Sequence, residues 1–409
     1  VATFYAHFNI VKDSKDYNPV NVVRVCESLT CELFGAHKLL QDIKKLENKN
    51  IKVVPGPCMG RCNVAPTVCV GKNYVDVANF DKVKKTIDEK NFDPFIPDYI
   101  NLSSYKKNGG YEIANKIKNG VISKKQVLDS LNESGLKGKG GAGFPTGMKW
   151  EIVSKYSGKK YVAVNGDEGE PGTFKDRFYL EKDPHRFLEG ALIASLFIKA
   201  SNVYIYMRDE YPSVIEILNN EIKNLEKEKI IPEGHFILRR GAGAYICGEE
   251  SAMIESIEGK RGLPRHRPPY VAEVGLFGFP TLTNNLETLF WIRDIIEKGS
   301  KWFSEQGKDE KKGFHSFSVS GRVKEPGVKV APAGITIQEL IDNYCGGMAD
   351  DHTFKGYLPG GASGGILPSE MNNIPLDYGS KELTEAGCFL GSAAIVVLSD
   401  KDSMKDVAL

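Results

Sequence analysis

The first hundred residues alternate short apolar runs with stretches in which apolar residues recur at helical spacing. The short runs predict strands at 22–25, 51–54, 67–70 and 73–77. Apolar residues three or four positions apart between Leu33 and Leu46, and again near 80–89, predict helices. This order of elements predicts a small α/β domain at the N-terminal end of the chain.

Between residues 160 and 300 apolar runs alternate regularly with helical patterns. Strands are predicted at 161–164, 203–207 and 235–238, and helices start at Pro184, Pro212 and Gly248. Strands separated by helices form parallel crossovers, so we expect a mostly parallel sheet covered on both faces. Ligands of such sheets bind beyond the carboxyl ends of the strands.

The last hundred residues return to a strand-rich pattern. The run 314–323 predicts a strand that turns at 324–327 and returns at 328–330. Thr336 and Glu339 form a capping box for a helix that ends near Tyr344. The glycine-rich run 360–365 lacks a following helix, and we interpret it as a tight turn beside the central domain.

Chain length and the positions of proline and glycine residues divide the chain into further segments. A length of 409 residues favours two to three domains. The polar stretch after residue 95 contains proline and glycine pairs and only weak periodicity, so we expect a linker there. The predicted segments are 1–95, the linker 96–122, 123–311, 312–400 and a terminal segment 401–409.

Charge and hydropathy exclude several classes of function. The net charge of +1 gives no footprint for nucleic acid or an anionic membrane surface. The longest apolar run, 191–198, is too short to span a bilayer, and no apolar leader opens the chain. Eight unevenly spaced cysteines favour metal ligands or redox chemistry over a secreted disulfide framework. We therefore expect a cytoplasmic protein with no direct membrane span.

Four cysteines follow predicted strands in two pairs. Cys26 and Cys31 are spaced C-x4-C, and Cys58 and Cys62 are spaced C-x3-C. Two such pairs on neighbouring loops suit a [2Fe–2S] cluster, with zinc as the competing interpretation. A C-x-x-C disulfide motif is absent from the sequence, and Cys69 is interpreted as a buried structural thiol.

The segment 135–150 concentrates six glycines and three lysines. Glycines bring backbone N–H groups close to an anion, and lysines supply the opposite charge. A polar helix at 123–133 precedes the segment, where a dinucleotide fingerprint would need a strand. We therefore predict a phosphate-binding loop, and the alternative is a flexible surface loop.

Four motifs resemble one family. They are the segments 137–150, 165–172, 243–250 and 283–288. They are similar to the NADH-oxidising flavoprotein subunit of complex I, which has soluble relatives in NAD-linked hydrogenases and formate dehydrogenases. The first hundred residues resemble a fused thioredoxin-like [2Fe–2S] domain, and 312–400 resembles a ubiquitin-like β-grasp (SLBB-type) domain. The resemblance implies a multidomain α/β fold with a Rossmann-like FMN/NADH domain and a mostly parallel sheet.

The resemblance also implies a set of site residues. Those expected to hold the FMN phosphate, ribityl chain and flavin are Gly138, Lys139, Gly140, Gly141, Lys149, Asn165, Asp167, Glu168, Tyr245, Gly248, Glu249, Asn284 and Asn285. Those expected on the NADH side are Phe144, Glu170, Glu250, Arg267 and Tyr270. Glu170 and Glu250 are expected to act in catalysis by contacting the ribose hydroxyls and disfavouring NADPH. Lys139 replaces the arginine common in the family, and Ile152 replaces an aromatic ring of some members.

The implied function is that of an NADH dehydrogenase (diaphorase) subunit. FMN would take a hydride from NADH and release single electrons to iron–sulfur clusters. The fused cysteine domain favours an NAD-linked, electron-bifurcating hydrogenase or formate dehydrogenase. The alternatives are a complex I NADH-input subunit and a flavin-free iron–sulfur relay scaffold.

The implied partners are NADH, a hydrogenase or formate dehydrogenase catalytic subunit, a small [2Fe–2S] subunit and ferredoxin. Family members continue into a helical bundle that binds a [4Fe–4S] cluster through C-x2-C-x2-C. Cys345 and Cys388 cannot form that motif, so its ligands are expected outside this chain.

Overall fold

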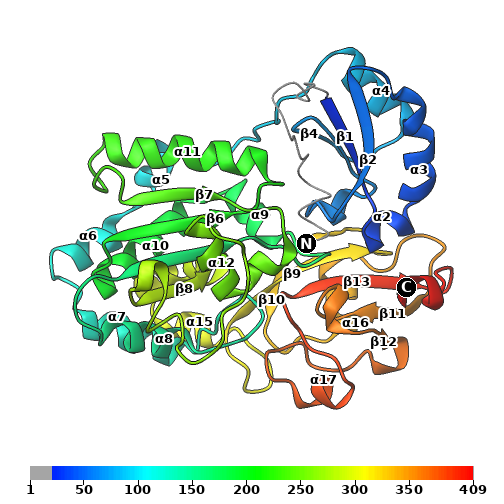
Figure 1. The fold of residues 1–409 in the computed structure, drawn as a ribbon. Coiled ribbons are helices and arrows are strands. Elements are labelled where there is room, and N and C mark those ends of the chain that lie inside the picture. The colour runs from blue at the N-terminus through cyan, green and yellow to red at the C-terminus, as the bar shows by residue number, and fades with distance from the viewer. Residues whose placement is uncertain (1–20, 409) are drawn as a thin grey trace.

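The computed structural model describes residues 21–408. The expectations for residues 1–20 of the first domain and for Leu409 lie outside the described residues. Figure 1 shows three bodies, each built around its own β-sheet. The N-terminal body lies beside the central one, and the C-terminal body contacts both.

The N-terminal sheet has the order β2-β1-β3-β4. Strand β1 pairs in parallel with β2 and antiparallel with β3. These strands are β1 (Asn21–Cys26), β2 (Ile51–Gly56), β3 (Val68–Val70) and β4 (Asn73–Val75), and the helices are α2 (Leu29–Leu33), α3 (Ala36–Ile43) and α4 (Phe80–Asp88). The strands and helices expected from the apolar pattern are all present.

The segment 96–122 does not behave as the expected linker. It forms α5 (Leu102–Lys107) and α6 (Glu112–Lys118), whose apolar residues belong to the core of the central body. Tyr105 donates to Glu189 over 2.7 Å, and the backbone N–H of Tyr111 donates to the same carboxylate over 2.9 Å. Two buried tyrosines thus hold this segment against α10, although its polar composition had indicated a flexible linker.

The central sheet is parallel throughout and has the order β7-β6-β5-β8. Its strands are β5 (Tyr161–Gly166), β6 (Asn202–Met207), β7 (Phe236–Arg240) and β8 (Thr281–Asn285). Helix α10 (Pro184–Ile198) is almost entirely buried because further helices cover its outer side. The other helices are α7 (Lys124–Ser134), α8 (Thr146–Ser154), α9 (Lys175–Leu180), α11 (Pro212–Lys227), α12 (Glu250–Ile257), α13 (Leu286–Phe290), α14 (Ile292–Lys298) and α15 (Ser300–Ser304).

The C-terminal sheet has the order β10-β9-β13-β11-β12. The central pair β9–β13 is parallel and its neighbours are antiparallel. The elements are β9 (Phe314–Gly321), β10 (Gly327–Pro332), α16 (Ile337–Tyr344), β11 (Phe354–Leu358), β12 (Leu367–Pro368), α17 (Lys381–Glu385), β13 (Ala394–Ser399) and α18 (Met404–Ala408). Thr336 and Glu339 form the expected capping box at the start of α16.

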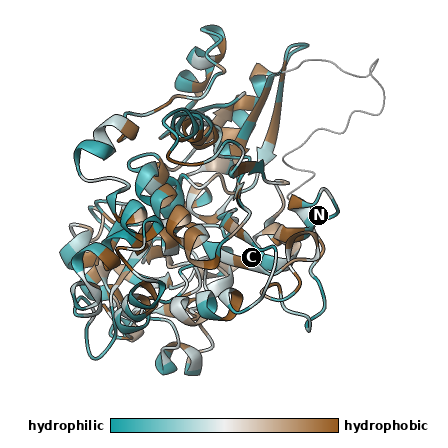
Figure 2. Cartoon of the chain, turned by 90° about the vertical axis from the view of Figure 1, so that its left-hand side faces the viewer, coloured by the Kyte–Doolittle hydropathy of each residue, from teal (hydrophilic) through white to brown (hydrophobic). Residues whose placement is uncertain are grey.

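The three bodies are packed against one another. Thr30 in α2 contacts Ser320 in β9 over 3.0 Å, and the guanidinium of Arg322 donates to the carbonyl of Leu33 over 2.9 Å. Outer helices alternate hydrophobic and hydrophilic positions along their length (Figure 2), as expected for helices with one buried face. Within residues 21–408, no helix combines the length and apolar character needed to cross a bilayer.

Candidate functional site

The glycine-rich loop lies between helices α7 and α8, at the carboxyl end of β8. An isolated bridge joins Lys137 to Pro145, and the N–H of Gly138 donates to the carbonyl of Phe144 over 2.8 Å. A Cβ placed on Gly140 would lie 3.2 Å from the Cβ of Asn285. Gly141 has a φ of +115°, which strongly favours glycine. The loop thus approaches the sheet edge closely because it lacks side chains.

A cavity of about 340 Å³ opens beside this loop. Segments from both the central and the C-terminal body line it. The lining residues are Lys139, Gly140, Gly141, Asn165, Glu168, Gly169, Glu170, Thr173, Lys175, Asp176, Tyr245, Ile246, Gly248, Glu249, Asn285, Gly360, Ser363, Phe389, Gly391 and Ser392. We call it the sheet-edge cavity. The tight turn at 360–365 therefore lies against the central body, as expected.

The ammonium groups of the loop lysines already have protein partners. Lys139 Nζ donates to the carbonyl of Phe314 and lies 3.0 Å from Nδ1 of His315. Lys137 Nζ donates to the carbonyl of Tyr378 over 3.3 Å. Burial lowers the pKa of Lys139 to about 8. These lysines therefore connect the glycine loop to the C-terminal body. From the sequence, their ammonium groups were expected to supply the positive charge opposite a bound phosphate.

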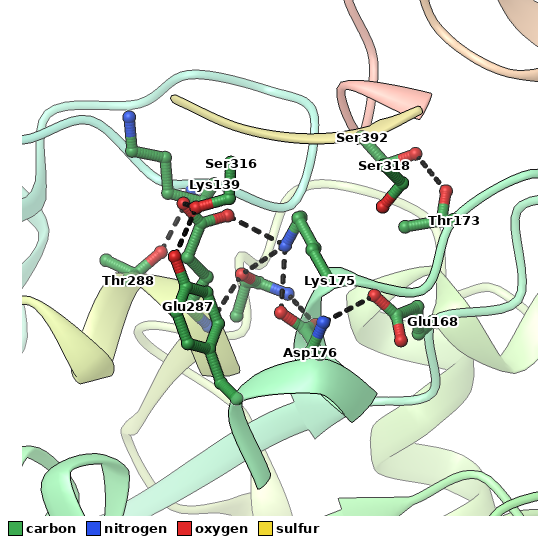
Figure 3. A network of polar contacts seen from close by, with 12 residues as sticks. Lys139, Glu168, Thr173, Lys175, Asp176, Glu287, Thr288, Ser316, Ser318 and Ser392 are labelled. Carbon is green, nitrogen blue, oxygen red and sulfur yellow. Dashed lines mark hydrogen bonds and ion pairs between the residues drawn. The ribbon is translucent and has the colours of Figure 1, made fainter. Parts of the chain in front are cut away.

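A lysine that sequence reasoning missed lies at the sheet-edge cavity. Lys175 Nζ is 2.8 Å from Asp176 and 3.0 Å from Glu287, and all three side chains are at most 3% exposed. Asn285 accepts from the same ammonium group over 3.3 Å. Burial opposes the charge of Lys175, but the adjacent carboxylates raise its pKa well above the usual value. Figure 3 shows this buried network beside Lys139 and Ser316.

Asp167 and Glu168 follow strand β5, where Asp167 is 3% exposed and Glu168 is partly buried. Burial raises the pKa of each carboxyl group to about 7. Glu168 accepts from the N–H groups of Asp176 and Arg177 at the start of α9 and from the hydroxyl of Tyr211. Glu168 lines the sheet-edge cavity, whereas Asp167 lines an adjacent cavity that also contacts Cys58.

The two glutamates expected on the NADH side have different surroundings. Glu170 accepts from the hydroxyl of Tyr245 over 2.6 Å and from the N–H of Ser363 over 2.8 Å. Glu250 lies 3.2 Å from Lys149 and 3.3 Å from Arg267. The pKa of Glu250 is lowered overall. Burial alone would raise it, but Lys149 and the other partners of the carboxylate together lower it by more. Glu250 is therefore ionised, and the positive charges of Lys149 and Arg267 offset its negative charge.

Other predicted residues lie around the cavity or beyond it. The side chain of Glu249 accepts from two N–H groups at the start of α12, and Asn284 accepts from the indole N–H of Trp150. Phe144 and Tyr270 are exposed on the surface, at 44% and 58%. The predicted residues that do not line the sheet-edge cavity are Gly138, Phe144, Lys149, Asp167, Glu250, Arg267, Tyr270 and Asn284. The roles of all the predicted site residues, lining or not, stay predictions.

The four paired cysteines converge in the N-terminal body. All four are buried, and Cys58 Sγ lies 3.5 Å from Cys62 Sγ. The sulfur of Cys26 is in hydrogen-bond contact with those of Cys31 and Cys58. Four converging thiols form a donor set that fits an iron–sulfur cluster. Cys69 lies apart, donates to the carbonyl of Gly71, and has a pKa raised to about 11 by burial.

The cysteine site adjoins the sheet-edge cavity. The backbone N–H of Gly172 is hydrogen-bonded to the sulfurs of Cys58 and Cys62. Phe174 packs on the same two cysteines. Residues 165–173, the end of β5 and the loop that follows it, thus form one segment, which we call the shared loop, with the cavity on one side and the cysteines on the other.

The cavity has features that fit a flavin mononucleotide. Gly140 and Gly141 leave the backbone open to a close ligand, and Lys175, balanced by Asp176 and Glu287, lies at the wall. Backbone and amide groups of the shared loop offer hydrogen bonds to a polar ring edge. The volume lies at the lower end of the range usual for small-molecule sites, about 300–1,000 Å³.

Comparison with known proteins agrees with these features. The family of the Nuo51 FMN-binding domain matches residues 131–294, and that of the thioredoxin-like [2Fe-2S] ferredoxin matches residues 1–91. An NADH-quinone oxidoreductase F-subunit of Rhizobium meliloti (strain 1021) is 42% identical over 322 residues, covering 76% of each chain. The corresponding protein of Aquifex aeolicus (strain VF5) is 40% identical over 76% of this chain and 73% of its own.

A solved structure extends the likeness to the whole chain. An NAD+-reducing [NiFe]-hydrogenase in the air-oxidised state superposes with a TM-score of 0.82 at 25% identity, covering 98% of this chain and 71% of that one. The expected family, fold and cofactors are confirmed. The chain belongs to the NADH-quinone oxidoreductase F-subunit family, and it is an NADH oxidoreductase that joins an FMN-binding domain to a thioredoxin-like [2Fe–2S] domain.

Proposed function

We propose that the chain is the NADH-input subunit of a multi-subunit oxidoreductase and that both of its cofactor sites use the shared loop. The loop lines the sheet-edge cavity with Asn165 and Glu168 and contacts the cysteine site through Gly172. This single observation carries the proposal. Because both sites use one loop, reduced cofactor on one side lies close to an electron acceptor on the other.

FMN bound in the sheet-edge cavity supplies the chemistry, since a flavin takes a hydride and returns electrons singly. The chain's residues bind and orient. Gly140, Gly141 and Lys175 are proposed to hold the phosphate and ribityl chain. Asn165, Glu168 and Asn285 are proposed to face the ring system. Cys26, Cys31, Cys58 and Cys62 are proposed to ligate the cluster.

We further propose that the physiological complex is an NAD-linked hydrogenase. The hydrogenase structure spans 98% of this chain, including its N-terminal body, whereas the two NADH-quinone oxidoreductase relatives match 76% of it. A complex I type assembly is the second candidate, favoured by the sequence identity to those relatives. In either assembly, partner subunits carrying further iron–sulfur clusters accept the electrons.

The test is anaerobic purification of the complex through a tag on this chain. Co-purified subunits are identified, and the complex is assayed for hydrogen-dependent NAD+ reduction and for NADH-dependent quinone reduction. Hydrogen-dependent reduction supports the hydrogenase assignment, and quinone reduction with membrane subunits supports complex I. Flavin-loaded protein that cannot reduce an artificial dye with NADH would contradict the NADH-input function itself.

A further inference from the structure

Arg208 occupies the boundary between the two cofactor sites. It follows strand β6 at the carboxyl edge of the central sheet, and its side chain is 5% exposed. Its guanidinium donates to the carbonyl of Glu168 over 3.2 Å and to the carbonyl of Cys58. Glu168 belongs to the shared loop, and Cys58 is a proposed cluster ligand. One buried cation thus bonds the backbone on both sides of the boundary.

The charge of Arg208 is kept at this position. Burial opposes it, but Glu210, Tyr211, Cys58 and Asp167 raise the pKa of the guanidinium well above its usual value. Its Nε forms an ion pair with the carboxylate of Glu210 over 3.3 Å. The guanidinium therefore stays charged beside the backbone of Cys58.

A positive charge next to a cluster ligand affects the cluster's reduction. One-electron reduction adds a negative charge to the cluster, and a nearby cation in a low-dielectric site favours that reduced form. Net charge and hydrogen bonds around the sulfurs are main determinants of cluster potentials. Arg208 supplies the charge, and the Gly172 N–H supplies a hydrogen bond to the sulfur of the same cysteine.

We propose that Arg208 is a positioning residue that holds the Cys58 loop against the shared loop and raises the reduction potential of the cluster. The inference rests on the proposed cluster ligands. It implies that the N-terminal cluster accepts electrons from the cofactor in the sheet-edge cavity. Each electron that this cofactor loses is gained by the cluster, whose reduced form Arg208 stabilises. It also assigns the residue a role separate from ligand binding.

Arg177 provides a matched control at the same boundary. Its Nε donates to the carbonyl of Gly60 over 2.9 Å, and its Nη2 donates to Asn63 over 3.2 Å. It therefore also ties the Cys58–Cys62 segment to the central body. Its guanidinium is paired with Glu181 at 2.5 Å and donates to Gly60 and Asn63, whereas that of Arg208 donates to the backbone of Cys58 itself. Loss of Arg177 loosens the boundary and leaves the charge beside Cys58 in place.

The experiment is a redox titration of the full chain, loaded anaerobically with FMN, iron and sulfide and followed by electron paramagnetic resonance. Arg208→Gln is expected to lower the cluster potential so that its electron-accepting equilibrium constant falls at least tenfold, which corresponds to about 59 mV. Arg208→Lys keeps the charge and is expected to retain most of the potential. Arg177→Gln is expected to leave it unchanged.

A second variant keeps the inference testable if Arg208→Gln does not hold its cluster. Glu210→Gln removes the counter-charge of Arg208 and is expected to raise the potential, whereas a role limited to joining the loops predicts no rise. An unchanged potential in Arg208→Gln, an equal fall in Arg177→Gln, or no rise in Glu210→Gln would overturn the inference. Absence of iron and of a cluster signal from the unmodified chain would instead overturn the proposed cluster site.

Discussion

The carboxylate of Glu287 lies 3.0 Å from the ammonium of Lys175, and both side chains are at most 2% exposed. Ser316 from the C-terminal body donates to the same carboxylate over 2.6 Å. The pair therefore joins the cavity wall to the neighbouring body, and neither charge has access to bulk water. Removing Glu287 leaves Lys175 with Asp176 but takes one of the two balancing carboxylates out of a buried site, which is more costly than losing a surface ion pair.

We predict that Glu287→Gln destabilises the protein by about 1–3 kcal/mol and reduces its FMN content. The physical reason is that the cavity wall loses the carboxylate that positions the ammonium of Lys175 and the hydroxyl of Ser316, while Asp176 still balances the charge of Lys175. Thermal unfolding and the flavin-to-protein ratio measure the two effects. Lys125→Ala is the matched control, because its ion pair with Asp129 is exposed and is expected to contribute little to stability. Equal losses in both variants would contradict the prediction.

We predict that Cys58→Ser removes the visible absorption of the N-terminal cluster, because serine replaces a soft thiolate ligand. Cys69→Ser is the control, since Cys69 is a buried thiol of the same body that lies outside the group of four and donates to the carbonyl of Gly71. Iron, sulfide and zinc are measured in anaerobically purified protein. Zinc without iron in the unmodified protein, or equal iron in both variants, would rule out the proposed ligand set.

The sequence predicted the strands because each is a short apolar run, and it predicted the loops because chemistry-bearing residues follow those runs directly. It could not predict where Lys137 and Lys139 point. Their partners, Tyr378 and Phe314, lie more than 170 positions away, and only the packed C-terminal body brings them together. Lys175 was missed because a single lysine after the Gly172 turn gives no periodic signal.

The helices α5 and α6 show a second limit. Each is short, and its polar residues outnumber the buried ones, so hydropathy alone indicates a linker. Tyr105 and Tyr111 fix the segment by hydrogen bonds to Glu189 and His185 on α10. The aromatic residues were the available signal, because a buried tyrosine needs a hydrogen-bond partner for its hydroxyl.

The buried His315 predicts a pH-dependent change in stability. Burial and the adjacent Lys139 lower the pKa of His315 to about 4, although Asp377 at 2.8 Å acts in the opposite direction. Groups facing the ring from neighbouring elements are Lys139, Asp377, Glu287 and the ring of Tyr378. In the unfolded chain the imidazole of His315 binds a proton with a pKa near 6.5, whereas in the folded chain it does so only near pH 4. The contribution of the neutral imidazole to the free energy of unfolding is therefore fully present above pH 6.5.

We therefore predict that this contribution is lost as the pH falls from 6.5 to 4, by at most about 3 kcal/mol. His315→Gln cannot titrate, so the stability difference between it and the unmodified protein should change over that interval. Chemical unfolding at several pH values measures the difference. A difference that stays constant from pH 4 to 7 would show that the histidine does not titrate as inferred.

The last prediction separates Glu170 from Glu250 in the choice between NADH and NADPH. Glu250 lies beside Lys149 and Arg267, which offset its charge, whereas the polar partners of Glu170, Tyr245 and Ser363, are uncharged. A carboxylate with its charge uncompensated repels the additional phosphate of NADPH more strongly. Glu170→Gln should therefore lower the ratio of kcat/KM for NADH to that for NADPH about tenfold, and Glu250→Gln should lower it less. Steady-state kinetics with an artificial dye measures both ratios, and a larger change in Glu250→Gln would show that the two carboxylates are assigned in the wrong order.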